Sequence, residues 1–102
     1  MDKKEIRHTL KIYADLIGQH FPFEKLVLYG SHAKDVFNND SDIDVAVIVK
    51  NNDMDLIFSE SLLWQLAAEV DSRIEPMIFD EDNDPIGFLA DILKHGEVIV
   101  SN

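Results

Sequence analysis

Two aspartates at the start of the most apolar stretch of the chain are the residues best suited to chemistry. Asp42 and Asp44 flank Ile43, where an almost continuous β-branched segment begins, and residues 43–49 are predicted to form a central strand. Because side chains alternate along a strand, both carboxylates point to the same side. Two anions about 4 Å apart repel by roughly 4 kcal/mol at an effective dielectric of about 20. No Lys or Arg lies between Asp35 and Val49, which leaves a bound divalent cation or a raised pKa to offset this repulsion.

The Asp-x-Asp spacing alone is weak evidence, because the chain contains 13 Asp residues and five such pairs. One alternative is a calcium loop at Asp80, Asp82 and Asp84, but Pro85 stands where that loop requires glycine. A solvated loop with a helix cap is the preferred interpretation there. The four histidines also lack the spacing of metal ligands. The position of Asp42 and Asp44 at the mouth of an apolar strand therefore distinguishes them from the other acids.

A third carboxylate, Glu75, lies in a predicted strand at residues 73–79. If the intervening helix is a crossover, this strand runs parallel to residues 43–49 and brings Glu75 near the paired aspartates. The alternative is that Glu75 pairs with Arg73 on one face of an exposed edge strand.

A glycine and a serine could supply the complementary half of a phosphate site. Gly30-Ser31 ends the short apolar run 26–29, and a glycine turn between a strand and a helix exposes backbone N–H groups that favour a phosphate. For this turn to meet the aspartates, strands 26–29 and 43–49 must be antiparallel. Three carboxylates for Mg²⁺ beside a phosphate-binding turn amount to a two-metal phosphoryl-transfer site.

The elements that position these residues follow from hydrophobic periodicity and capping residues. A stripe of Ile6, Leu10, Tyr13 and Ile17 predicts an amphipathic helix over residues 2–20. Pro76 has no N–H for a sheet ladder, so strand 73–79 is expected at an edge or bulged. The other predicted elements are a helical turn at 31–36, a helix at 55–69 with Trp64 in the core, a helix at 85–95 that begins at Pro85 and stops at Gly96, and a short final strand at 97–100.

These elements predict an α/β (α+β) fold, a small mixed sheet of three to four strands flanked by helices in the order α-β-α-β-α-β-α(-β). The 102 residues are expected to form one domain, since 46% are apolar and neither linkers nor repeats interrupt them. Without cysteine, disulfides and thiolate chemistry are excluded. No apolar run is long enough for a membrane span or follows the start as in a signal peptide, so a cytoplasmic location is expected.

The charge is strongly acidic and uneven. The formal net charge of −11 argues against a protein that clamps nucleic-acid backbone, so no direct nucleic-acid partner is expected. Residues 1–51 carry 8 acids and 7 bases, a net of −1, whereas residues 52–102 carry 12 acids and 2 bases, a net of −10. An acidic half of this kind suits contact with a basic partner.

The segments Leu28-Tyr29-Gly30-Ser31-His32-Ala33-Lys34 and Ser41-Asp42-Ile43-Asp44-Val45-Ala46-Val47 together resemble the signature of the polymerase-β-like nucleotidyltransferase superfamily. The chain is most similar to its minimal single-domain members, the MNT proteins that accompany HEPN-domain toxins, and the resemblance spans nearly the whole of residues 1–102. Arg73-Ile74-Glu75-Pro76 falls where that family places its third metal-binding carboxylate. One departure is Asp35, which replaces the usual glycine of the turn.

The resemblance implies that Asp42, Asp44 and Glu75 hold two Mg²⁺ ions and that Gly30 and Ser31 bind the triphosphate. It implies transfer of a nucleoside monophosphate, AMP from ATP, to a hydroxyl. In related antitoxins the acceptor is a tyrosine of the partner HEPN ribonuclease toxin, which implies a hetero-oligomer. The alternative is a non-catalytic antitoxin that neutralises a basic partner through its acidic surface.

Overall fold

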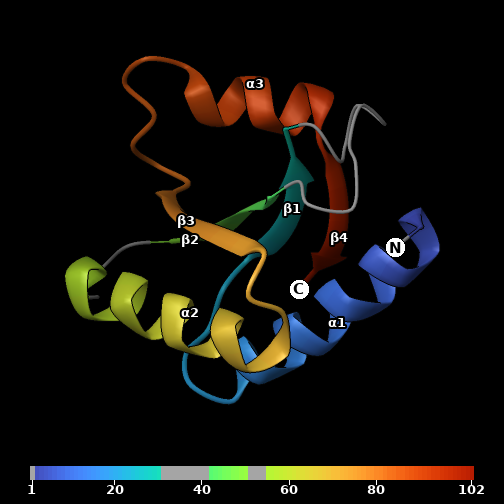
Figure 1. Cartoon of the computed structure of the whole chain (residues 1–102). Helices are drawn as coiled ribbons and strands as arrows, with labels where there is room; N and C mark the ends of the chain where they lie inside the picture. The colour runs from blue at the N-terminus through green and yellow to red at the C-terminus, as the bar shows by residue number, and fades with distance from the viewer. Residues whose placement is uncertain (1, 31–41, 51–54) are drawn as a thin grey trace.

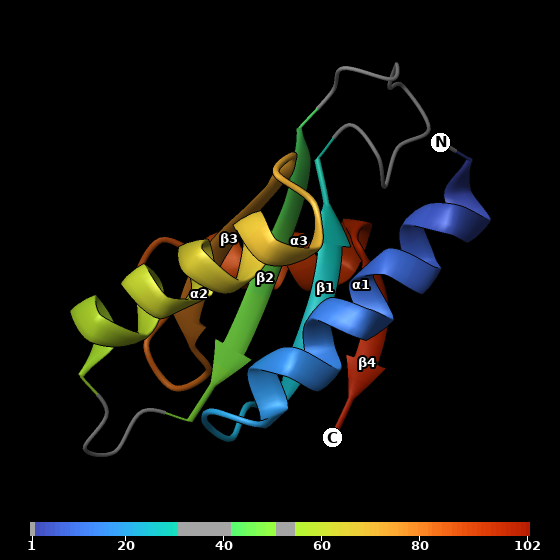
Figure 2. The same cartoon turned by 60° about the horizontal axis from the view of Figure 1, so that its bottom comes forward.

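A four-stranded mixed sheet lies between two helices on one face and a third helix on the other (Figures 1 and 2). This computed structural model describes residues 2–30, 42–50 and 55–102. In chain order the elements are α1 (Lys3–Gly18), β1 (Lys25–Tyr29), β2 (Ile43–Val49), α2 (Leu56–Val70), β3 (Ile74–Asp80), α3 (Phe88–His95) and β4 (Glu97–Ser101). The predicted fold class is confirmed, and the short final strand completes the sheet. The predicted turn at 31–36 falls outside the described residues.

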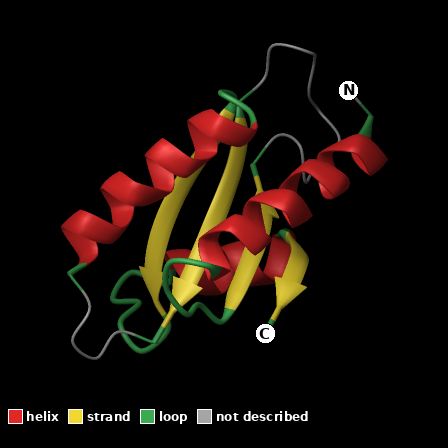
Figure 3. Ribbon diagram, turned by 90° about the horizontal axis from the view of Figure 1, so that it is seen from below, coloured by secondary structure: helices red, strands yellow, loops and turns green. Residues whose placement is uncertain are grey.

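The strand order β3-β2-β1-β4 confirms both predictions about strand direction. β1 pairs with β2 in antiparallel fashion, whereas β3 pairs with β2 in parallel after the crossover through α2 (Figure 3). β4 pairs antiparallel with the other side of β1. Pro76 lies in β3 at the edge of the sheet, as expected for a residue without an N–H.

α1 forms where the apolar stripe predicts it. The carboxylate of Asp2 accepts a hydrogen bond from the backbone N–H of Glu5 at 2.8 Å and so caps the first turn. The stripe is fully buried against the sheet and α2, and it consists of Ile6, Leu10, Tyr13 and Ile17. Arg7 and Lys3 on the same helix form ion pairs with Glu97 of β4. These contacts join the start of the helix to the last strand.

β2 is covered on both faces, which explains why its apolar run is continuous rather than alternating. Val45, Val47 and Val49 belong to the core beneath α1 and α2. Ala46 and Ile48 pack on the other side with Leu89 and Ile92 of α3. Side chains two residues apart share a face, so Asp44 lies on the α3 side of the sheet with Ala46 and Ile48.

The expected burial of Trp64 is wrong. α2 buries Leu63, Leu66 and Ala67, whereas Trp64 is 45% exposed and Ile57 is 84% exposed. Ile57 and Trp64 are seven residues apart and therefore share one helix face, which turns away from the sheet. α2 has apolar residues around most of its circumference, so the sequence pattern could not show which side would meet the sheet.

The expected start of the last helix at Pro85 is also wrong, because α3 begins three residues later at Phe88. Gly87 precedes it with a φ of 73°, a left-handed conformation that interrupts the chain before the helix. Asp84 nevertheless acts as a cap, because its carboxylate accepts hydrogen bonds from the N–H groups of Leu89 and Ala90 at 3.0 Å. The predicted stop at Gly96 is confirmed.

No helix in the described ranges combines the length with the apolar character needed to cross a membrane.

Candidate active site

Three neighbouring strands each place one residue in a row across the sheet. Tyr29 at the end of β1 is opposite Asp44 of β2, and Asp44 is opposite Glu75 of β3. Neighbouring strands lie about 4.8 Å apart, so these residues are within reach of one another. Asp42 comes immediately before β2 and is exposed. The sheet therefore brings together the three carboxylates that the sequence singled out.

The negative charges of this site act on one another. Partial burial raises the pKa of Glu75, and the charges of Asp42 and Asp44 raise it further. Burial likewise raises the pKa of Tyr29, with Asp44 and Glu75 adding to the effect. Arg73 forms a two-point contact with Asp71, with its Nη2 atom 2.7 Å from Oδ2 and its Nε atom 3.1 Å from Oδ1. Asp42 and Asp44 are the charged groups that raise the pKa of Glu75, so the site concentrates negative charge.

Gly30, the first residue of the predicted phosphate-binding turn, lies directly beside the Asp44 carboxylate. It has a φ of 74°, in the region that favours glycine. A Cβ atom at this position would collide with Oδ2 of Asp44. Glycine therefore suits the backbone turn here, and its missing Cβ leaves the space that the Asp44 carboxylate occupies. Ser31 and Asp35, the other residues of interest in this turn, lie outside the described residues.

The donor chemistry of the site fits a divalent cation. Asp42, Asp44 and Glu75 offer only carboxylate oxygens, which are the ligands Mg²⁺ prefers, and a cation would offset their repulsion. Within the described ranges, however, no three or more His, Cys, Asp or Glu side chains are already arranged to hold a metal ion. The metal site therefore remains a prediction from the donor set and its charge.

The site combines paired strand carboxylates with a glycine turn, and residues 8–102 match the family model described as polymerase beta, nucleotidyltransferase. The chain belongs to this nucleotidyltransferase family. The resemblance to the polymerase-β-like nucleotidyltransferases indicated by the motifs is thereby confirmed. No curated protein sequence matches this nucleotidyltransferase.

Two solved structures share the fold. A Sulfolobus solfataricus protein provisionally assigned as a nucleotidyltransferase superposes with a TM-score of 0.71 at 17% identity, covering 98% of this chain and 84% of the other. A chain from a toxin–antitoxin structure with AMP-PNP superposes with a TM-score of 0.62 at 19% identity, covering 100% of this chain and 75% of the other. At these identities the two likenesses support the fold.

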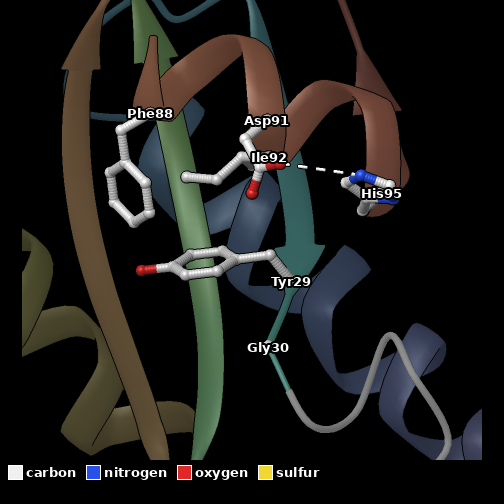
Figure 4. A pocket seen from close by; sticks show the side chains of 7 residues that line it. Tyr29, Gly30, Phe88, Asp91, Ile92 and His95 are labelled. Atoms are coloured by element: carbon white, nitrogen blue, oxygen red, sulfur yellow. Dashed lines mark ion pairs between the residues drawn. The ribbon is translucent and has the colours of Figure 1, made fainter. Parts of the chain in front are cut away.

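The nucleotidyltransferase also contains a pocket that the sequence did not reveal. It adjoins Gly30 and lies between the ring of Tyr29 and helix α3 (Figure 4). Tyr29 is next to the recognised glycine, but its side of the sheet followed only from its pairing with Asp44. Phe88 and His95 come from α3, far along the chain, and no spacing in the sequence linked them to the turn.

The acidic segment after β3 forms a turn, in agreement with the solvated loop and helix cap preferred above. Asp80 accepts a hydrogen bond from the N–H of Asp82 at 3.0 Å, and Asp84 caps α3. Glu81 and Asp82 are exposed.

Proposed function

We propose that this nucleotidyltransferase transfers AMP from ATP to a hydroxyl group, specifically a tyrosine of a partner HEPN ribonuclease toxin, and so acts as an antitoxin. The observation that carries the proposal is the row formed by Asp44 and Glu75, with Asp42 beside it and Gly30 against Asp44. Three carboxylates, the ligands that Mg²⁺ prefers, next to the glycine turn support the proposal. Residues 1–102 act as one catalytic domain in this proposal.

The three carboxylates would hold the two metal ions of the proposed reaction. Asp42, Asp44 and Glu75 together would hold one Mg²⁺, and Asp42 with Asp44 would hold the second. When bound, the two ions would lower the pKa of the acceptor hydroxyl and neutralise the triphosphate. Gly30 and Ser31 would orient the triphosphate through backbone N–H groups and the serine hydroxyl.

The transfer itself needs no covalent intermediate with the protein. The acceptor oxygen forms a bond to the α-phosphorus of ATP while the bond from that phosphorus to the bridging oxygen breaks. Pyrophosphate leaves, and the hydroxyl proton passes to solvent. The role of the chain is to position the two reactants and to hold the charge that develops between them.

The assignment of a toxin as the acceptor is supported by the motifs and by the fold shared with a chain from a toxin–antitoxin structure containing AMP-PNP. A cytoplasmic complex with the toxin follows from this assignment.

Labelling with α-³²P-ATP tests the proposal. The purified chain, Mg²⁺ and the protein encoded by the neighbouring reading frame are incubated together, and label is expected on a tyrosine of that protein. Asp44→Asn and EDTA should both abolish the label, whereas Glu81→Gln, which removes an exposed charge elsewhere, should not. Absence of label with the unaltered chain, together with full neutralisation by Asp44→Asn, would contradict the proposal.

Neutralisation through the acidic surface is the second candidate, and the exposed turn after β3 favours it. Asp80 and Asp84 have internal hydrogen-bond roles, so the sharpest variant is Glu81→Lys with Asp82→Lys. Masking predicts that this double variant loses neutralisation while Asp42→Asn retains it. The opposite pattern supports catalysis.

A further inference from the structure

The pocket between the end of β1 and α3 borders the candidate active site. Gly30 forms part of its wall and also contacts the space filled by the Asp44 carboxylate. Tyr29 lies between the pocket and the Asp44 carboxylate, because its position in β1 is paired with Asp44 and its ring faces α3 (Figure 4). A ligand in the pocket would therefore lie directly beside a nucleotide phosphate held at Gly30 and the carboxylates.

The walls of the pocket are aromatic and apolar. The rings of Tyr29 and Phe88 meet edge to face, with centroids 6.3 Å apart and an interplanar angle of 89°. Phe79 packs against Phe88, with the two ring centroids 5.5 Å apart. Ile92 covers the ring of Tyr29 from the helix side (Figure 4). Together these rings and Ile92 form a rigid aromatic and apolar wall against which a flat ring can pack.

The size of the pocket limits what can enter it. Its volume is about 160 Å³. This is several times the roughly 30 Å³ of a water molecule but below the roughly 300 Å³ at which sites for whole drug-sized ligands begin. A single ring system fits, whereas a complete nucleotide does not.

The mouth of the pocket is polar. Asp91 and His95 lie one helical turn apart on α3, with Oδ1 of Asp91 3.6 Å from Nε2 of His95 (Figure 4). A carboxylate accepts from an amino group and an imidazole exchanges hydrogen bonds with a ring nitrogen, so this pair matches the edge of a heterocyclic base. A plain phenol ring would leave most of these groups unused.

We propose that this pocket binds the nucleobase of the nucleoside triphosphate, with the base packed against the aromatic wall of Tyr29 and Phe88 and its edge at Asp91 and His95. The proposal rests on the proposed function, since it takes the phosphates to be at Gly30 and the carboxylates. It assigns base recognition to α3 and the end of β1 of this chain itself, so a partner protein is not needed to hold the base.

Calorimetric titration of the full chain with Mg²⁺-ATP and with Mg²⁺-tripolyphosphate tests the assignment. Phe88→Ala and Tyr29→Leu should each weaken ATP binding by about 5- to 100-fold, as expected for loss of an aromatic contact to a base. Their affinity for tripolyphosphate, which has no base, should stay within about twofold. Tyr29→Phe keeps the ring and should bind ATP as the unaltered chain does.

The matched control is Leu93→Ala, because Leu93 also lies on α3 and is 41% exposed, close to the 39% of Phe88, but does not line the pocket. It should leave both affinities unchanged. Thermal unfolding of each variant separates a local effect from loss of the fold.

Each contrary result overturns the assignment in a distinguishable way. If both variants bind ATP normally but transfer AMP slowly, the pocket holds the acceptor ring rather than the base. If tripolyphosphate binding falls as much as ATP binding, the pocket does not contribute separately from the phosphate site. If the unaltered chain binds neither ligand, the proposed function fails together with the pocket.

Discussion

Asp44 and Glu75 occupy paired positions on the neighbouring parallel strands β2 and β3. The crossover through α2 brings these two carboxylates together from distant parts of the chain, and the period of the strand adds Asp42 to the same side. A fold normally separates like charges, so this pairing carries a cost in stability that a bound cation would remove.

That cost predicts an unusual response to Glu75→Gln. Removing one of the clustered charges should stabilise the metal-free chain by about 1 kcal/mol, which corresponds to a rise of roughly 4–8 °C in Tm for a domain of this size. The same substitution should abolish most of the Tm increase that millimolar Mg²⁺ gives the unaltered chain. Differential scanning calorimetry with and without Mg²⁺ measures both effects.

Glu81→Gln is the control, since Glu81 is exposed in the turn after β3 and the substitution changes the net charge equally. It should leave Tm and the Mg²⁺ response almost unchanged. A lower Tm for Glu75→Gln without metal would show that Glu75 makes a favourable contact in the fold.

Much of this arrangement could be predicted from the sequence because each step rests on a strong local rule. The continuous apolar run gives β2, the length and capping of the next segment give a crossover helix, and a parallel β3 then brings Glu75 to Asp44. The register cannot be obtained this way, because pairing of Tyr29 with Asp44 depends on how the whole sheet packs. For that reason the pocket beside Tyr29 could not be predicted.

Gly30→Ala should be more harmful than the same change at Gly87. Both glycines have a φ near +74°, at 74° and 73°, so alanine meets a similar backbone strain of about 1–2 kcal/mol at each. At Gly30 the new Cβ also collides with Asp44, whereas at Gly87 nothing lies within 4 Å. Urea unfolding should show a larger loss of stability for Gly30→Ala than for Gly87→Ala, by up to about 1 kcal/mol.

Gly30→Ala should also weaken the Mg²⁺ response, because the Asp44 carboxylate has to shift from its place beside Gly30. Gly87→Ala should retain that response in full. Equal losses of stability for the two variants, with equal Mg²⁺ responses, would mean that Asp44 adapts freely.

The two local errors of the sequence-based prediction have physical causes. α2 is apolar around most of its surface, so only packing against the sheet decides that Leu63 is buried and Trp64 is half exposed. At α3, Asp84 caps the helix from farther back in the sequence than a standard N-cap residue. Its carboxylate accepts hydrogen bonds from the N–H groups of Leu89 and Ala90, five and six residues later, across an intervening turn. Residue preferences at the first helical turn do not encode such an arrangement.

Acid stability should depend on the Asp71–Arg73 pair that precedes β3. The side-chain hydrogen bond from Arg73 is the main reason that the pKa of Asp71 is lowered, and the two side chains are only 15% and 25% exposed. The stabilisation is therefore fully present above the ordinary aspartate pKa of about 3.9 and disappears as the pH falls through the lower pKa of the folded state. Asp71→Asn should lose about 1–2 kcal/mol at pH 7 and much less at pH 2.

Urea unfolding at pH 7, 4 and 2 measures this convergence. Glu69→Gln, an exposed change at the end of α2, serves as the control and should follow the unaltered chain at each pH. A stability difference for Asp71→Asn that stays constant over this range would rule out the ion pair as its source.

The hydroxyl of Tyr13 should contribute to stability by joining α1 to α2. It is fully buried and donates a hydrogen bond to the carbonyl oxygen of Leu63 at 2.8 Å, and burial raises its pKa so that it remains protonated at any practical pH. Tyr13→Phe should lose about 1–1.5 kcal/mol in urea unfolding. Tyr29→Phe removes a weaker contact, from the hydroxyl to Sδ of Met77 at 3.6 Å, and should lose less than about 0.5 kcal/mol. Similar losses in the two variants would show that the contact between α1 and α2 depends on packing of the ring and not on the hydrogen bond.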